Sequence, residues 1–151
     1  MIGIEVVLDE KLNSVRFILD ILHLLKLEQS YFRIGDIDIV YNSSKNTCCL
    51  ENNVYSHNTV LSFLSEIKHL NFLSLFAFET ESDVCLVDNY TQFYNSRCEL
   101  VLLCADSIFF ELYAKKKSDI QIVMKICKKY GQNNVTFKRL DDDKRKRFSV
   151  I

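Results

Sequence analysis

The sequence has no proline, no tryptophan and only three glycines in 151 residues. Gly3, Gly35 and Gly131 stand alone. Glycine-rich loops let the backbone approach a phosphate, so their absence argues against nucleotide binding of the P-loop or Rossmann kind. Turns must instead be made by Asn, Asp and Ser, which hydrogen-bond locally and tolerate turn conformations.

Long apolar runs are also missing. The longest uncharged apolar stretches are Phe72–Phe78 and Leu100–Ala105, and both are far shorter than the roughly 20 residues that span a bilayer. The first residues, Met1–Glu5, lack the basic region of an export signal. We therefore expect a cytoplasmic protein with no membrane contact. Hydrophobic residues make up 48% of the chain, which favours one globular domain over residues 1–151.

The six cysteines do not have the spacing of a metal site. Cys48 and Cys49 are adjacent, Cys98 and Cys104 are six residues apart, and the three histidines are scattered. Zinc ligands usually come as closer pairs. We expect no metal and no cofactor, and we interpret the thiols as reduced, mainly structural side chains.

Charge is distributed unevenly along the chain. Residues 1–113 contain 7 Lys/Arg and 16 Asp/Glu, whereas residues 114–151 contain 12 and 4. Two interpretations stand: the two parts neutralise each other on folding, or an acidic face docks a basic protein partner. The residues expected to bind such a partner are Glu79, Glu81, Asp83 and Asp88, which lie in the base-free span between Lys68 and Arg97, with Asp36 and Asp38 as a second patch.

A metal cation and a nucleic acid are less well supported as binding partners of these charged residues. Asp36 and Asp38 would share one face of a strand and could hold a cation, but such pairs are usually a solvated face. Lysines cluster after residue 114, as phosphate contacts require. The sequence pI of about 6.3 argues against nucleic-acid binding.

Periodicity predicts an α/β or α+β fold with a mixed, largely antiparallel sheet of five to eight strands and about three helices. Gly35-Asp36 favours a hairpin turn within residues 31–41, with one continuous strand as the alternative. The expected helices are 10–27 capped by Asp9, 58–69 capped by Asn58, and 118–130 with a Ser118–Gln121 capping box and a terminal Gly131. Further strands are expected at 2–8, 47–50, 72–78, 83–87, 99–105, 108–115, 134–140 and 147–151, and a turn or one helical turn at 89–95.

The stretch CELVLLCADSIFFELYA, residues 98–114, is open to two interpretations. It is either a buried hairpin with Asp106-Ser107 as its turn, or an enzyme site in which Cys104, Asp106 and Glu111 act. No motif surrounds these residues, and buried thiols are inert. We favour the hairpin, and expect Glu111 to face water or pair with a lysine if this stretch is scaffold.

The segment NSRCELVLLCADSIFFELYAKKKSDIQIVMKICKKYGQNNVTF, with YFRIGD near Tyr31, resembles a family of small uncharacterised proteins of Bacillus- and Clostridium-type bacteria, known only as a domain of unknown function. The resemblance implies a cytosolic α/β domain and supplies no catalytic residue. The general type is also similar to bacterial toxin-immunity proteins, which bind basic toxin domains through acidic patches.

These observations favour a non-catalytic binding protein of the immunity or antitoxin type, whose partner is a protein with a basic surface such as a toxin domain. The alternatives are a small enzyme with a site near the 98–115 hairpin, and a structural or regulatory subunit. The wide apolar face of helix 10–27 fits a homodimer as well as burial in the core.

Overall fold

The computed structural model describes residues 3–42, 53–132, 135–138 and 148. The strands are β1 (Gly3–Val7), β2 (Tyr31–Tyr41), β3 (Tyr55–Ser56), β4 (Ile67–Phe78), β5 (Cys98–Ala105), β6 (Phe109–Ala114) and β7 (Val135–Lys138). The helices are α1 (Ser14–Leu24), α2 (His57–Ser65), α3 (Tyr90–Asn95), α4 (Lys117–Lys129) and the short 3-10 helix η1 (Glu81–Asp83).

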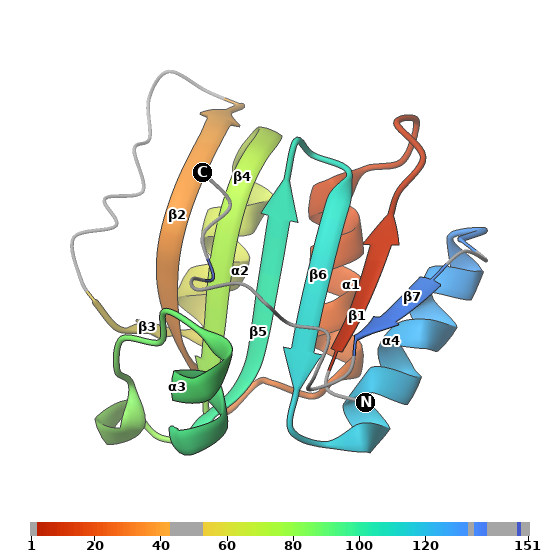
Figure 1. Cartoon of the computed structure of the whole chain (residues 1–151). Helices are drawn as coiled ribbons and strands as arrows, with labels where there is room; N and C mark the ends of the chain where they lie inside the picture. Colours follow the sequence, from red (N-terminus) through yellow and green to blue (C-terminus); the bar gives the residue numbers. More distant parts are fainter. Residues whose placement is uncertain (1–2, 43–52, 133–134, 139–147, 149–151) are drawn as a thin grey trace.

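The seven strands form one antiparallel sheet in the order β3-β2-β4-β5-β6-β1-β7. Helices α1, α2 and α4 cover one face of this sheet, and α3 lies against one end of the opposite face (Figure 1). We call the face opposite α1, α2 and α4 the open face. The predicted α+β class and strand number are confirmed, and every pairing is antiparallel.

The larger hydrophobic core lies between the sheet and the three long helices. Each strand contributes alternate residues to it, as in the run Leu100, Leu102 and Cys104 of β5. Helix α1 contributes Phe17 and Ile18, both 0% exposed. Because this core takes the apolar stripe of α1, burial accounts for the wide apolar face that the sequence shows.

A smaller core covers part of the open face. Val101 and Leu103 of β5 and Tyr113 of β6 point to this side, where they meet Phe93 of α3 and Phe148. The two phenyl rings each lie against the Tyr113 ring, with centroids 6.5 Å and 5.0 Å away. The residues after β4 therefore fold back over the sheet and leave only part of the open face for other contacts.

The hairpin predicted at Gly35-Asp36 is wrong, and the alternative of one continuous strand is correct. β2 pairs with β4 along its whole length, and the register shifts between Ile34 and Ile37. A bulge inserts an extra residue into one strand and bends it. The Gly-Asp pair thus marks a bulge, which has the same preference for small, conformationally tolerant residues as a turn.

Two predicted N-terminal caps lie at other residues. Asn13 caps α1 by accepting a hydrogen bond from the Arg16 amide (2.9 Å), while Asp9 accepts from the Lys11 amide in the preceding turn. Ser56, not Asn58, caps α2 by accepting from the Thr59 amide. Each helix start has several residues of a type that can cap a helix. Residue type alone therefore pointed to a nearby residue and not to the one that forms the cap.

Helix α4 does not start as the sequence predicts, but it ends as predicted. Helix α4 begins at Lys117, so Ser118 lies inside its first turn and forms no capping box. Gly131 has φ +74° and donates its amide to the Lys128 carbonyl (2.9 Å), as predicted for a terminal glycine.

One expected strand is wrong, and two lie outside the described residues. Residues 83–87 are not a strand: η1 occupies Glu81–Asp83 and no regular structure follows it. The strands expected at 47–50 and 147–151 lie outside the described residues, apart from Phe148. Residues 89–95 do form one short helix, α3. Among the residues placed by the structure, no helix combines the length and the apolar character needed to cross a membrane.

Candidate binding face

Asp106 and Ser107 form the turn between β5 and β6. Both have positive φ, 50° and 66°, the backbone pattern of a two-residue hairpin turn. The Ser107 hydroxyl donates to the Leu70 carbonyl (2.5 Å) and its amide donates to the Asn71 carbonyl (3.2 Å). The hairpin interpretation of residues 98–114 is therefore confirmed, and Ser107 ties its turn to β4.

Cys104 and Glu111, the main enzyme suspects, lie on opposite faces of the sheet. Cys104 belongs to the core beneath the helices, where burial raises the pKa of its thiol to about 12. Glu111 alternates with Phe110 and Leu112, which face that core, and so points to the open face. The two side chains cannot act on one substrate, and Asp106 at the exposed turn joins neither.

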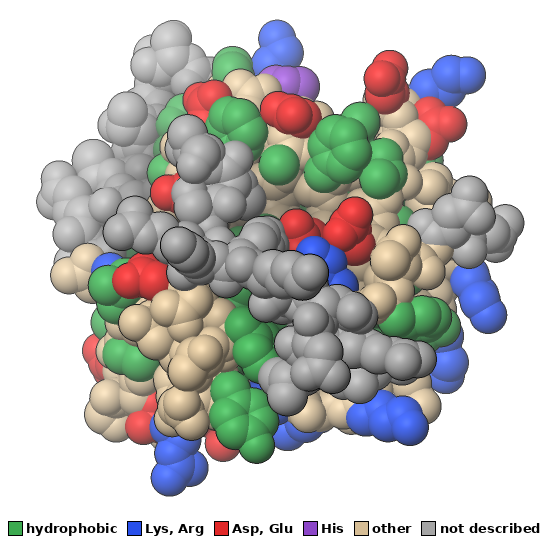
Figure 2. Space-filling model, in the orientation of Figure 1, with side chains coloured by type: hydrophobic (Ala, Val, Ile, Leu, Met, Phe, Trp, Pro, Cys, Tyr) green, Lys and Arg blue, Asp and Glu red, His purple; other side chains and the backbone are tan. Residues whose placement is uncertain are grey.

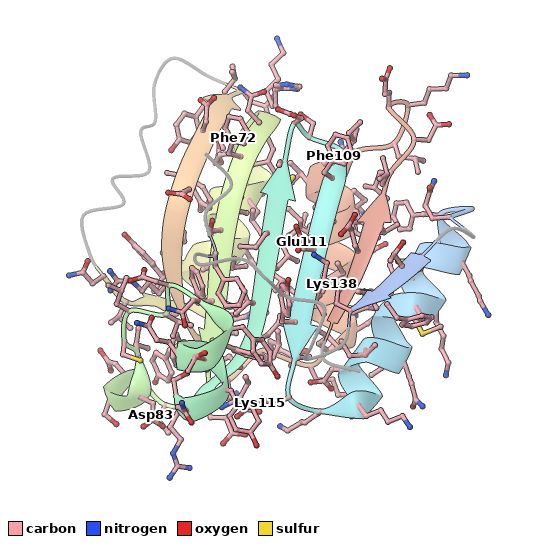
Figure 3. The ribbon with its side chains drawn as sticks, in the orientation of Figure 1. Phe72, Asp83, Phe109, Glu111, Lys115 and Lys138 are labelled. Carbon is pink, nitrogen blue, oxygen red and sulfur yellow. The ribbon has the colours of Figure 1, made fainter. Side chains whose placement is uncertain are left out.

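Glu111 is part of an ion-pair cluster in the middle of the open face (Figure 3). Its carboxylate accepts from Lys138 Nζ (2.7 Å) and from the Tyr113 hydroxyl (3.0 Å), and Lys138 also contacts Glu5 (3.2 Å). The side chains of Lys138 and Glu111 are only 18% and 22% exposed. The cluster links β6, β1 and β7, so Glu111 meets the expectation for scaffold.

The predicted acidic residues divide into paired and unpaired ones. Glu79 contacts Lys116 (3.4 Å), which also reaches Glu99. Asp83 accepts from the Thr80 hydroxyl (2.7 Å), and Asp38 accepts from the Asn71 side-chain amide (3.0 Å). Among the described residues, Glu81, Asp83 and Asp88 have no basic partner within ion-pair distance. The negative charge of these three residues is therefore not neutralised by an ion pair with a described side chain.

One residue from each of the two predicted acidic patches lines the same cleft. Asp36 of β2 and Asp88 of the segment after η1 both line it, and its volume is about 300 Å³. We call the residues Asp36, Asp38, Glu81, Asp83 and Asp88 the acidic flank. In Figure 2, several Lys and Arg side chains lie on the α4 side and several acidic side chains lie on the β2 side, while further acidic side chains lie at the centre and upper right of the view.

Two residues of this cleft, Arg33 and Ser74, were missed by the sequence interpretation. They lie on neighbouring strands, because Arg33 pairs with Phe76 in the β2–β4 register. Gly35, Phe76, Leu86, Val87 and Phe148 complete the lining. A lone arginine and a lone serine form no local pattern, and the strand pairing brings them to the same cleft as Asp88.

A family model describes this chain. The model of "Protein of unknown function (DUF2691)" matches residues 1–149. The chain belongs to this family. No curated protein and no solved structure matches it.

Membership in the DUF2691 family confirms the resemblance to a domain of unknown function. The match covers nearly the whole chain, not only the segment from Asn95 to Phe137 that carried the resemblance. Because the family has no described activity, it transfers no catalytic or binding residue to the cleft or the flank. Among the described residues, no group of three His, Cys, Asp or Glu side chains is arranged to hold a metal ion.

Thiol alkylation tests whether the 98–114 hairpin can support chemistry. Burial raises the pKa of Cys98 and Cys104 to about 12 and that of Cys127 to about 11, whereas Cys85 is exposed. At about pH 8 the thiolate fraction of Cys104 is on the order of one in ten thousand. We expect iodoacetamide to label Cys85 in the folded protein and to leave the other three intact, as measured by peptide mass spectrometry.

The control is the same reaction in concentrated urea, where Cys98, Cys104 and Cys127 should be labelled as Cys85 is. Labelling of Cys104 in the folded protein at the rate seen in urea would contradict the buried assignment and reopen the enzyme alternative.

Proposed function

We propose that the chain is a non-catalytic, cytoplasmic binding protein of the immunity or antitoxin type, which holds a basic protein partner through the acidic flank. The observation that carries the proposal is that Asp36 and Asp88, one residue from each predicted acidic patch, line the same cleft although they are distant in the sequence. Glu81, Asp83 and Asp88 keep their charge unpaired by any described cation.

Such a flank acts mainly on the approach of a partner. Like charges on one side of a protein create a potential that attracts an oppositely charged surface and raises its association rate. The effect is strongest at low ionic strength, because salt screens exposed charges. A basic protein is attracted to this side of the molecule, and a nucleic acid is repelled from it.

An apolar area on the same face supports a protein partner. Val7 of β1 and Phe109 of β6 are paired neighbours and are 44% and 45% exposed. Phe72 lies at the same end of the sheet (Figure 3). Protein interfaces combine an apolar, often aromatic centre with a polar rim. The open face offers both, with the acidic flank on the β2 side.

Charge reversal tests the proposal. The double variant Glu81→Lys/Asp83→Lys changes two unpaired carboxylates of the flank. We expect proteins captured from a lysate of the native host to include a basic partner on the wild type that is lost on this variant. With that partner purified, the association rate should fall by about tenfold or more at low salt, measured by surface plasmon resonance.

The matched control is Glu10→Lys/Glu28→Lys, which changes the net charge equally. Both residues are exposed, lie on either side of α1 in the sequence and are not flank residues. This control should keep the partner and most of the association rate. The proposal is rejected if the flank variant and the control bind alike, or if the association rate of the wild type does not depend on salt.

A further inference from the structure

The cleft beside β2 contains a buried polar group that the fold leaves without a partner. Ser74 is 1% exposed, lines the cleft, and its hydroxyl has no hydrogen-bond partner among the described residues. An unpaired buried hydroxyl is destabilising, whereas an alanine at the same place would avoid that cost. The hydroxyl is therefore best explained by a group that enters the cleft from outside.

Gly35 leaves the space beside this buried hydroxyl free of a side chain. A Cβ atom added at Gly35 would lie 3.2 Å from the Ser74 Cβ, 3.8 Å from its Oγ and 3.2 Å from the Phe76 ring. A side chain there would fill the space above the hydroxyl. The missing side chain thus forms part of the cleft, and the bulge at Gly35-Asp36 shapes its β2 wall.

Two opposite charges face the same space. Arg33, Asp36 and Asp88 all line the cleft, and neither Arg33 nor Asp88 forms an ion pair with a residue in the described ranges. Asp88 is held by its backbone, because its amide donates to the Gln92 side chain (2.6 Å) and its carbonyl accepts from the Phe148 amide. Arg33 and Asp88 thus offer opposite charges along the lining of one cleft.

We propose that this cleft binds a small zwitterionic ligand, a free α-amino acid with an apolar side chain. The ligand carboxylate lies against Arg33, its ammonium group against Asp88, and Ser74 hydrogen-bonds to one of these two groups. Phe76, Leu86 and Phe148 provide apolar wall for the side chain. The volume of about 300 Å³ is at the lower end for ligand clefts and suits a ligand of this size.

This site shares Asp88 with the acidic flank, but it also needs Arg33 and Ser74, which are not flank residues, so its failure can be distinguished from failure of the proposed protein partner. Its chemistry is also selective. A carboxylic acid without the ammonium group leaves Asp88 unpaired, and an amine without the carboxylate leaves Arg33 unpaired. Both losses weaken binding, since each removes a hydrogen bond to a charged group.

Calorimetric titration of the full chain tests the inference. L-leucine and L-phenylalanine are compared with L-glutamate, and leucine with 4-methylpentanoate and 3-methylbutylamine, which each lack one of its two charges. We expect leucine or phenylalanine to bind with a dissociation constant of about 1 mM or below. Glutamate and both leucine analogues should bind at least about tenfold more weakly.

Variants then assign the contacts. Arg33→Gln and Asp88→Asn should each weaken binding at least about tenfold, and Gly35→Ala should abolish it. Ser74→Ala should weaken binding while raising the melting temperature, a combination that a purely structural role would not give. The matched controls Arg97→Gln and Glu81→Gln alter exposed charges outside the cleft and should leave affinity unchanged.

The inference is overturned if neither leucine nor phenylalanine binds at about 10 mM, or if the analogues that lack one charge bind as well as leucine. Unchanged affinity in Arg33→Gln and Asp88→Asn overturns it as well. The analogue series uses only the wild-type chain, so it decides the question even where a variant fails to fold. Loss of amino-acid binding in Arg33→Gln with partner capture intact separates this site from the flank.

Discussion

Replacing Phe17 by alanine is expected to lower the free energy of unfolding by about 3–5 kcal/mol. Phe17 is 0% exposed, and its ring meets those of Phe110 and Tyr130 edge-on at 5.0 Å and 5.3 Å. The side chain therefore joins α1 to β6 and to the end of α4. The surrounding backbone cannot collapse into the cavity without moving a helix, which places the loss at the high end for a core residue. Equilibrium unfolding in urea measures it.

Phe137→Ala is the matched control, because it removes the same ring from an edge strand where the side chain is 41% exposed. Its cost should be about 1 kcal/mol or less. Similar losses in the two variants would contradict the placement of the main core under α1. The comparison uses one chemical change, so differences in the unfolded chain largely cancel.

The hairpin at residues 98–114 shows what the sequence can predict. Leu100–Ala105 and Phe110–Ala114 carry alternating or continuous apolar patterns with turn-forming residues between them, and all of these signals are local. The partners of the hairpin are not local. β6 pairs with β1 at the other end of the chain, and β1 pairs in turn with β7. No pattern within a short window encodes such pairings, so the strand order was beyond prediction.

The candidate site was predictable only in part, for the same reason. The acidic residues are visible as a base-free span and an Asp-x-Asp pair, but the meeting of Asp36 and Asp88 at one cleft depends on how residues 79–88 fold against the sheet. Arg33 and Ser74 become neighbours through the register of β2 and β4. Glu111 shows the opposite case. The sequence suggested that its carboxylate could act in an enzyme site, but in the structure it forms an ion pair with Lys138 of β7.

The sequence prediction was wrong where the same residue types are favoured in two different local structures. Gly35-Asp36 fits a hairpin turn and a bulge equally well, and the length of β4 decides between them. Asp9 and Asn58 are good caps by type, yet Asn13 and Ser56 hold the geometry. In each case the tertiary pairing of neighbouring segments selected among options that were locally equivalent.

Gly3→Ala is expected to destabilise the protein by about 3 kcal/mol or more, because the added methyl group meets backbone. An ideal Cβ at Gly3 would lie 2.6 Å from the Leu112 carbonyl oxygen and 3.0 Å from the Tyr113 ring. β1 lies between β6 and β7, so it cannot move away from one neighbour without disturbing the other. Thermal and urea unfolding measure the loss.

Gly131→Ala makes the same change where space is open. No atom lies within 4 Å of its added Cβ, so its cost comes only from φ +74° and should be about 1–2 kcal/mol. Gly131→Asn should recover part of that loss, since asparagine tolerates this conformation, whereas Gly3→Asn should be worse than Gly3→Ala. Equal losses for Gly3→Ala and Gly131→Ala would show that β1 does not pack against β6 as closely as described. The opposite responses to asparagine separate steric conflict from backbone strain.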